Sequence, residues 1–311
     1  MSTLIKKISK ASSGDKVYII QNIKDLPKGD FDKNQLEHIK KQLDDGKKTI
    51  AINHYGSYSF LVKPDEKKTR SLTLEACRVA GNSMLSSING NGISEIQIID
   101  SGKLPIETLC FAEGMLLGNY QFLKYRSTKG KEKNSLTKIN VLSAGIDKKE
   151  IEFLQTIGEA VYISRDLVNE PVSFLNAPQY GKEVAKMGKA AGFKVEVFNK
   201  SKIESLKMGG LLAVNKGSVD PPVFVVMEHK PKNAINKQPY VFVGKGVVYD
   251  TGGISLKPND GMMTMKCDMG GAAAVAGAMY AIAKAELPVW VVGLTPATDN
   301  RPDGNCVVQA M

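Results

Sequence analysis

Four charged side chains with the capacity for chemistry stand in one glycine-rich stretch of the sequence, Val241–Ala274. They are Lys245, Asp250, Lys257 and Asp268. Carboxylate oxygens are suitable ligands for divalent cations. A lysine ligates a metal only when it is neutral; its ordinary pKa is about 10.4, but a nearby divalent cation favours loss of that proton. A second lysine that stays charged can polarise a carbonyl or stabilise an oxyanion. The stretch is therefore a candidate metal site with lysine participation.

Two other interpretations of the same residues remain open when spacing alone is considered. The glycines could cradle a phosphate, although the stretch contains neither GxxxxGK[ST] nor GxGxxG. Its aspartates would also repel a phosphate unless a metal intervened. In the structural interpretation, Asp268 caps the following helix, Asp250 forms a turn and the lysines are solvated.

The elements around this stretch would hold its charged residues at one end of a sheet. We predict a strand at Tyr240–Val243, a glycine-rich loop, a mostly buried helix at Gly270–Ala285 and a strand at Val289–Leu294. This order favours a parallel sheet with a right-handed crossover. Ligands of such sheets bind beyond the carboxyl ends of the strands, and Lys245 and Asp250 follow the first strand directly.

The rest of the chain also alternates strands and helices, which predicts an α/β fold. Upstream we expect strands at Val17–Ile20, Thr49–Asn53, Ser57–Val62, Glu95–Ile99 and Lys138–Leu142, and helices at Asp32–Leu43, Arg70–Ile88 and Pro105–Tyr125. Further on we expect an exposed loop at Arg126–Lys138, a helix with Asp147 as N-cap that runs through Val168, a helix at Pro178–Ala191 ended by Gly192, strands at Lys194–Phe198 and Pro222–Met227, and a short helix after Lys202.

Several motifs in the second half of the chain resemble one known family. VGKGVVYDTGGISLKP (243–258) and MKCDMGGAAA (265–274) are similar to the metal-binding core of the leucyl aminopeptidases, the M17 cytosol aminopeptidase family. SRDLVNEP (164–171), the NAP run at 176–178, VGLTP (292–296) and the NRP run at 300–302 resemble further segments of that family. The resemblance is strong over about 160–311 and weak over 1–150.

The resemblance implies a role for each of the four charged residues. Lys245, Asp250 and Asp268 would be metal ligands, with Asp250 shared between two divalent ions, most naturally Mn or Zn. Lys257 would be the catalytic lysine that contacts the substrate carbonyl and the developing oxyanion. A site with two metal ions can activate a bridging water as the nucleophile and hold the free amine of a peptide.

Two methionines lie near these residues in the sequence. In similar proteins such methionines help to line the pocket for the first side chain of the substrate, and Met262 and Met265 are candidates for that role. Plain packing in the core is an equally weighted interpretation of both.

The sequence departs from the family in one respect. The family's remaining metal ligands lie in an NTDAEGR motif downstream, and this motif does not occur before Met311. The sequence thus carries three of the five protein ligands that the resemblance implies. We therefore expect a C-terminally incomplete member of the family with little or no activity of its own.

The resemblance also implies a domain organisation and a cellular setting. It implies an α/β protein with an N-terminal macro-like α/β domain (1–150) and part of a metallopeptidase catalytic domain with a mixed or parallel sheet (151–311). The function would be release of leucine-like N-terminal residues from peptides in the cytoplasm, by a homo-oligomer, a hexamer in the family. The alternatives are a binding or regulatory module with a basic N-terminal domain, and a pseudo-enzyme that keeps the fold for assembly.

Charge and composition restrict the alternatives further. The net charge is +10, but residues 240–311 carry five Lys/Arg against six Asp/Glu, so the surplus lies in scattered lysines upstream. No aromatic residues are interleaved for base stacking, so we expect a solvated surface and not a nucleic-acid site. The four cysteines form no CxxC pair, which argues against disulfides and zinc knuckles. We also expect no signal peptide and no membrane span.

Overall fold

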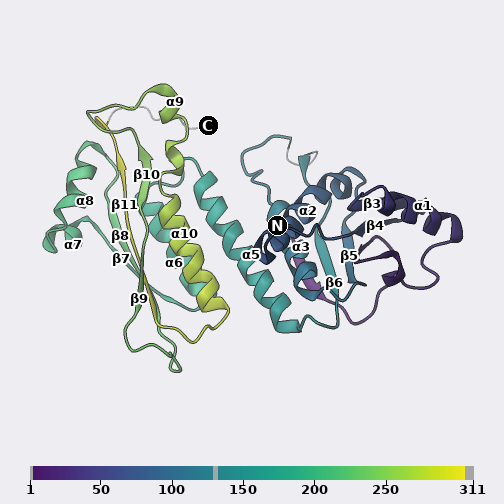
Figure 1. Cartoon of the computed structure of the whole chain (residues 1–311). Helices are drawn as coiled ribbons and strands as arrows, with labels where there is room; N and C mark the ends of the chain where they lie inside the picture. Colours follow the sequence, from purple (N-terminus) through teal and green to yellow (C-terminus); the bar gives the residue numbers. More distant parts are fainter. Residues whose placement is uncertain (1–2, 129–131, 305–311) are drawn as a thin grey trace. The chain divides into compact units, whose positions relative to one another are not determined.

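The computed structural model describes residues 3–128 and 132–304 (Figure 1). The chain forms two compact units, Met1–Gly158 and Glu159–Met311, which divide within helix α5 (Lys148–Asn169). Residue 150, the predicted domain boundary, lies in the same helix. The helix begins with a reciprocal cap: Glu150 N donates to Asp147 Oδ1 (2.8 Å) and Asp147 N donates to Glu150 Oε2 (2.7 Å). The predicted N-cap at Asp147 is therefore confirmed.

The first unit contains a sheet with strand order β1-β6-β5-β2-β4-β3, parallel except at β3. The strands are β1 (Leu4–Lys7), β2 (Lys16–Ile19), β3 (Thr49–Asn53), β4 (Tyr58–Val62), β5 (Glu95–Asp100) and β6 (Lys138–Leu142). The helices are α1 (Lys33–Asp44), α2 (Arg70–Gly90) and α3 (Pro105–Gly118). Five of these strands and all three helices confirm predictions.

Helices cover both faces of this sheet because side chains alternate along its buried strands. In β2, Val17 and Ile19 pack in one cluster with residues of α2 and α3, whereas Tyr18 packs in the other cluster with Ile39 of α1. Helices α2 and α3 approach closely. A Cβ atom added at Gly114 would lie 2.0 Å from the carbonyl oxygen of Arg78.

In the first unit, the end of one predicted helix was wrong and one strand was not predicted. The helix predicted to reach Tyr125 ends at Gly118, since the next residue, Asn119, turns inward. Its buried amide nitrogen donates to Thr3 Oγ1 and to the carbonyl of Leu136, both at 2.8 Å. Strand β1 was not predicted, because Ile5 is the only buried residue among its four. Of the predicted loop Arg126–Lys138, residues 129–131 lie outside the described part.

The second unit contains a mixed sheet. Its strands are β7 (Lys194–Phe198), β8 (Val223–His229), β9 (Tyr240–Val243), β10 (Gly246–Asp250) and β11 (Val291–Asn300). Strands β9 and β10 follow each other along one edge of β11, both parallel to it, while β8 lies antiparallel on the other edge and β7 antiparallel to β8. The predicted parallel crossover from β9 to β11 is confirmed. The loop predicted after Val243 was wrong at residues 246–250, which form β10.

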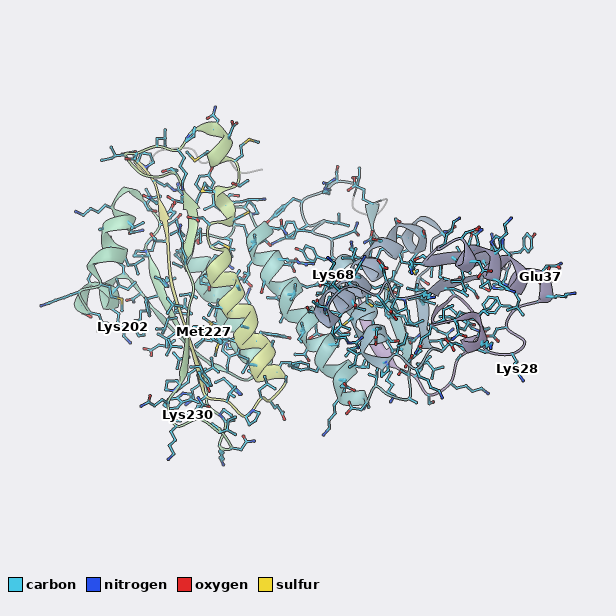
Figure 2. The ribbon with its side chains drawn as sticks, viewed as in Figure 1. Lys28, Glu37, Lys68, Lys202, Met227 and Lys230 are labelled. Carbon is cyan, nitrogen blue, oxygen red and sulfur yellow. The ribbon has the colours of Figure 1, made fainter. Side chains whose placement is uncertain are left out.

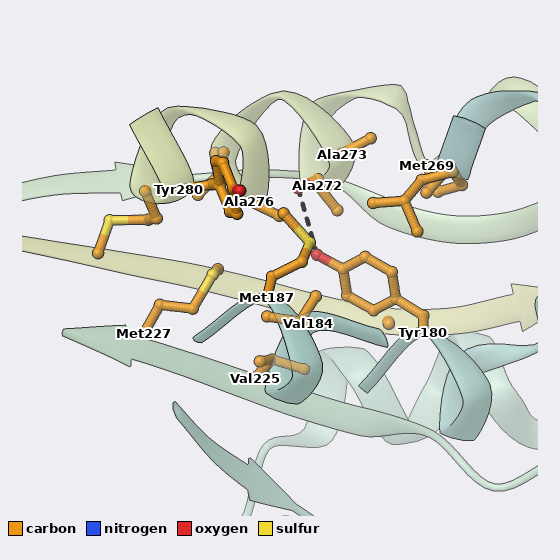
Figure 3. Close-up of a cluster of buried hydrophobic side chains, with 14 of the residues drawn as sticks. Tyr180, Val184, Met187, Val225, Met227, Met269, Ala272, Ala273, Ala276 and Tyr280 are labelled. Atoms are coloured by element: carbon orange, nitrogen blue, oxygen red, sulfur yellow. Dashed lines mark hydrogen bonds between the residues drawn. The ribbon is translucent and has the colours of Figure 1, made fainter. Parts of the chain in front are cut away.

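Helices of the second unit lie on both sides of its sheet. Figure 1 shows α6 (Ala177–Ala191) and α10 (Gly270–Lys284) on one side and α7 (Lys200–Ser205) and α8 (Gly209–Val214) on the other. The short helix α9 (Asn259–Met262) lies in the loop after β10. Tyr180 of α6 is fully buried, and its hydroxyl lies 3.2 Å from the carbonyl oxygen of Ala272 (Figure 3). The same hydroxyl lies 3.1 Å from Thr295 Oγ1. These contacts tie α6 to α10 and to β11.

The lysines labelled at the periphery of Figure 2 are exposed. Lys28, Lys202 and Lys230 extend outward, whereas Met227 lies in the core (Figure 2). Two of these ammonium groups lie over aromatic rings of the chain itself: Lys202 over Phe198 and Lys230 over Trp290.

Membrane and disulfide features can be judged over the described residues. Among them, no helix has the length and hydropathy needed to span a membrane. Within the same ranges Cys77, Cys110 and Cys267 are free thiols, as predicted. Cys306 lies outside them.

Candidate functional site

The four charged residues predicted from the glycine-rich stretch converge at the carboxyl end of β10. Lys245 Nζ lies 2.6 Å from Asp268 Oδ2 and 3.8 Å from Asp250 Oδ2. Lys257 Nζ lies 2.6 Å from the same Asp250 oxygen. One lysine thus bridges the two carboxylates, and the second lysine contacts one of them.

Close backbone packing brings Lys245 and Asp268 together. Lys245 lies between β9 and β10, and its carbonyl accepts a hydrogen bond from Ala272 N of α10 at 2.9 Å. This approach requires glycine on both sides. A Cβ atom at Gly244 would lie 2.5 Å from the carbonyl oxygen of Gly271, and one at Gly271 would lie 3.0 Å from Lys245 N. The glycines therefore let the first turn of α10 pack against the two residues between β9 and β10, Gly244 and Lys245.

A tight loop returns Lys257 to Asp250. Gly252 has a φ of +87° and Gly253 a φ of +67°, in the left-handed region that glycine adopts freely. The loop closes with a hydrogen bond from Lys257 N to the carbonyl of Thr251 (2.9 Å). The ammonium of Lys257 then donates to the backbone carbonyl of Asp250 (3.0 Å) and lies 3.1 Å from the thioether sulfur of Met265.

Asp250 is held in its ionised form. Burial by itself would raise the pKa of its carboxyl, but hydrogen bonds from Lys257, from Gly252 N and from the amide of Asn300 outweigh burial and place the pKa far below its ordinary value. Its Oδ1 accepts from Gly252 N (3.0 Å) and from Asn300 Nδ2 (2.8 Å). Oδ2 faces the two lysines.

The structural interpretation of Asp268 was wrong. Met269 occupies the N-cap position of α10, and no described side chain caps that helix. Asp268 instead ends a single 3-10 turn (Met265–Cys267) and directs its carboxylate toward Lys245. Within residues 3–128 and 132–304, its buried Oδ2 has the ion pair with Lys245 but no partner in hydrogen-bond geometry. An acceptor oxygen in that state is suited to a cation.

The donor set fits part of a divalent metal site. Two carboxylates converge on one point, and the Lys245 ammonium supplies positive charge there. No group of three or more His, Cys, Asp and Glu side chains that could hold a metal occurs in the described ranges. Asp250, Asp268 and Lys245 are the side chains that meet at this point.

The remaining site predictions concern the methionines. Met262 and Met265 are partly buried and pack against the apolar cluster of the second unit. Met265 also contacts Lys257 through its sulfur. Asn300, which contacts Asp250, was not predicted as a site residue; the sequence signal that could have indicated it is the NRP run at 300–302.

Comparisons with known proteins point to one family. Residues 162–310 match the family model described as "Cytosol aminopeptidase family, catalytic domain". The probable cytosol aminopeptidase of Chlorobium limicola is 43% identical over 218 residues, which cover 66% of this chain and 43% of that protein. The probable cytosol aminopeptidase of Geobacter sulfurreducens is 36% identical over 241 residues, which cover 75% of this chain and 48% of that protein.

Solved structures share the fold. The bottromycin maturation enzyme BotP in complex with Mn superposes with a TM-score of 0.75 at 26% identity, covering 96% of this chain and 62% of that one. A tomato leucine aminopeptidase mutant superposes with a TM-score of 0.76 at 21% identity, covering 96% and 63%. The predicted α/β class is thus confirmed as a mixed α/β fold with two sheets.

The chain spans about half the length of the curated relatives it matches. Residues 162–310 belong to the M17 cytosol aminopeptidase family, a family of hydrolases.

Proposed function

We propose that this protein acts as a metal-dependent aminopeptidase that releases leucine-like N-terminal residues from peptides. The observation that carries the proposal is the convergence of Lys245, Asp250 and Asp268 on one point with Lys257 beside it. Because the chain spans about half of its curated relatives, the activity, the peptide substrate, the homo-oligomer and the cytoplasmic setting are all part of the proposal.

Lys245, Asp250 and Asp268 would hold the metal, Mn or Zn. Asp250 is the residue suited to be shared between two ions, as the resemblance implies, because it lies between the two lysines. When bound, such ions supply Lewis acidity and lower the pKa of a coordinated water. The related BotP structure is described as a complex with Mn.

Lys257 would donate a hydrogen bond to the substrate carbonyl. Its ammonium has three protons and three acceptors in the structure: Asp250 Oδ2, the carbonyl of Asp250 and the sulfur of Met265. A thioether is the weakest acceptor of the three. A substrate carbonyl oxygen can therefore replace the Met265 contact while Asp250 keeps the ammonium in place. In this proposal Met262 and Met265 line the pocket for the first side chain.

Metal binding by the purified 311-residue chain tests the proposal. We expect isothermal titration with Mn²⁺ to show binding that is lost in Asp250→Asn and Asp268→Asn. The matched control is Asp260→Asn, an exposed aspartate in the loop of the same site. Absence of Mn²⁺ binding, or equal binding by all three variants, would overturn the proposal.

Turnover tests the activity of the chain itself. With three described ligands, we expect slow or no hydrolysis of a chromogenic leucyl anilide in excess Mn²⁺ or Zn²⁺. The control is Lys237→Ala, at an exposed position. If the chain turns over the substrate, and Lys257→Ala abolishes this turnover while Lys237→Ala does not, the chain is active by itself. That result would contradict this part of the proposal.

A further inference from the structure

Asn300 and Asp250 end neighbouring strands at the same level. Asp250 is the last residue of β10 and Asn300 the last residue of β11, and the two are register partners in the parallel ladder. The ladder is irregular between Val247 and Asp250. This irregularity and the strand ends bring the Asn300 amide beside the Asp250 carboxylate, where Nδ2 donates to Oδ1 at 2.8 Å.

The hydrogen bonds of Asp250 distinguish its two oxygens. Oδ1 accepts from two neutral amide donors, Gly252 N at 3.0 Å and Asn300 Nδ2. A carboxylate oxygen has two lone pairs, so these donors saturate Oδ1. Oδ2 is then the oxygen left for the charged cluster, and it lies 2.6 Å from the ammonium of Lys257 and 3.8 Å from that of Lys245.

Asn300 is itself held in place by the loop that follows β10. Its backbone carbonyl accepts from Thr251 N (2.9 Å) and from Thr251 Oγ1 (2.8 Å). On the other side, a Cβ atom at Gly253 would lie 3.1 Å from Asn300 Oδ1. The amide nitrogen must face Asp250, because an ionised carboxylate only accepts hydrogen bonds.

We propose that Asn300 is a positioning residue that fixes the rotation of the Asp250 carboxylate, so that Oδ2 faces the cation site. The inference rests on the proposed function, since it concerns how the chain's own ligand meets a divalent cation. Without the amide, Oδ1 keeps only the backbone donor of Gly252, and the carboxylate can rotate away from the orientation in which Oδ2 faces the cation site. Groups that orient metal ligands typically change metal affinity by about 10–100-fold when they are removed.

The experiment compares Mn²⁺ affinity across asparagine variants of the full chain, by titration calorimetry and by the electron paramagnetic resonance spectrum of bound Mn²⁺. Asn300→Ala is the main variant. Asn300→Ser keeps a polar group too short to reach Asp250. The control is Asn236→Ala: its amide accepts from Trp290 N (2.7 Å) and donates to Trp290 O (2.8 Å), so it has a structural role in the same unit.

We expect both Asn300 variants to bind Mn²⁺ about 10–100-fold more weakly and to give an altered spectrum, while Asn236→Ala keeps the affinity even where its Tm falls. Affinity unchanged in the Asn300 variants, or lowered equally in Asn236→Ala, would overturn the positioning role and leave the proposed function standing. Failure of the unsubstituted chain to bind Mn²⁺ would overturn the proposed function and this role together.

Discussion

Lys257 and Asp250 contact each other twice: the ammonium lies 2.6 Å from Oδ2 of the carboxylate and donates to the backbone carbonyl of the same residue at 3.0 Å. The double contact fixes the ammonium beside the carboxylate group that is also a candidate metal ligand. A charged lysine there competes with a cation for Asp250, whereas Lys245 must lose its proton to help bind one. The two lysines are therefore expected to respond differently to substitution.

Substituting each lysine by methionine distinguishes the proposed metal ligand from the proposed catalytic group. Lys245→Met should weaken Mn²⁺ binding at least about tenfold, because it removes a proposed ligand. Lys257→Met should leave the affinity equal or higher, because it removes a positive charge beside Asp250. Where turnover is measurable, Lys257→Met should lower kcat by about 10²–10³, the effect of removing an oxyanion donor. Calorimetry measures the Mn²⁺ affinity, and a leucyl anilide assay measures kcat. Equal loss of Mn²⁺ affinity in both variants would contradict the assignment.

The buried carboxylate of Glu107 gives the first unit a pH-dependent stability. Glu107 is 7% exposed, and an ion pair with Arg70 lowers its pKa from 4.5. Folding thus favours the ionised form; the stabilisation is complete above the unfolded pKa and is lost as the pH falls through the folded one. We expect Glu107→Gln to lower Tm at pH 7, with a difference from the unsubstituted chain that shrinks toward about pH 3.

The control for this prediction is Glu37→Gln, an exposed glutamate of α1. Its Tm should follow that of the unsubstituted chain across the whole pH range. A constant Tm difference for Glu107→Gln would show that the ion pair does not cause the pH dependence.

The close approach of α2 and α3 makes Gly114 sensitive to a single methyl group. A Cβ atom there would lie 2.0 Å from the carbonyl oxygen of Arg78, whereas one at Gly90, the last residue of α2, would meet no described atom within 4 Å. Gly114→Ala should cost about 1–3 kcal/mol in the free energy of unfolding. Gly90→Ala should be neutral or stabilising by up to about 1 kcal/mol. Urea unfolding measures both, and equal effects would be evidence against tight packing.

The buried hydroxyl of Tyr180 should contribute measurably to the second unit. Tyr180→Phe leaves the fully buried Thr295 Oγ1 without this partner and should lower the free energy of unfolding by about 1–2 kcal/mol. Tyr55→Phe removes the same hydroxyl from a fully exposed ring and should stay within about 0.5 kcal/mol. Thermal unfolding compares the two variants, and no loss for Tyr180→Phe would show that the hydroxyl does not couple α6 to β11.

The sequence by itself determined most of the local structure. Helix α6, with Gly192 at its end, and strands β3 and β9 could be predicted because side-chain periodicity and caps act over a few residues. The four charged residues could be found because glycine spacing and charge type are visible along one stretch.

Only the tertiary structure decided what depends on residues far apart in the sequence. Strand β1 has one buried side chain and forms by pairing with β6, more than a hundred residues away. The end of α3 depends on the contacts of Asn119 with Thr3 and Leu136. The alternative interpretation of Asp268 as a helix cap was excluded by the tertiary structure, in which its carboxylate lies beside Lys245 and the first turn of α10 packs against Gly244. The contact of Asn300 with Asp250 likewise required two strand ends to meet, because hydrogen bonds between strands follow the sheet register and not the order of residues in the chain.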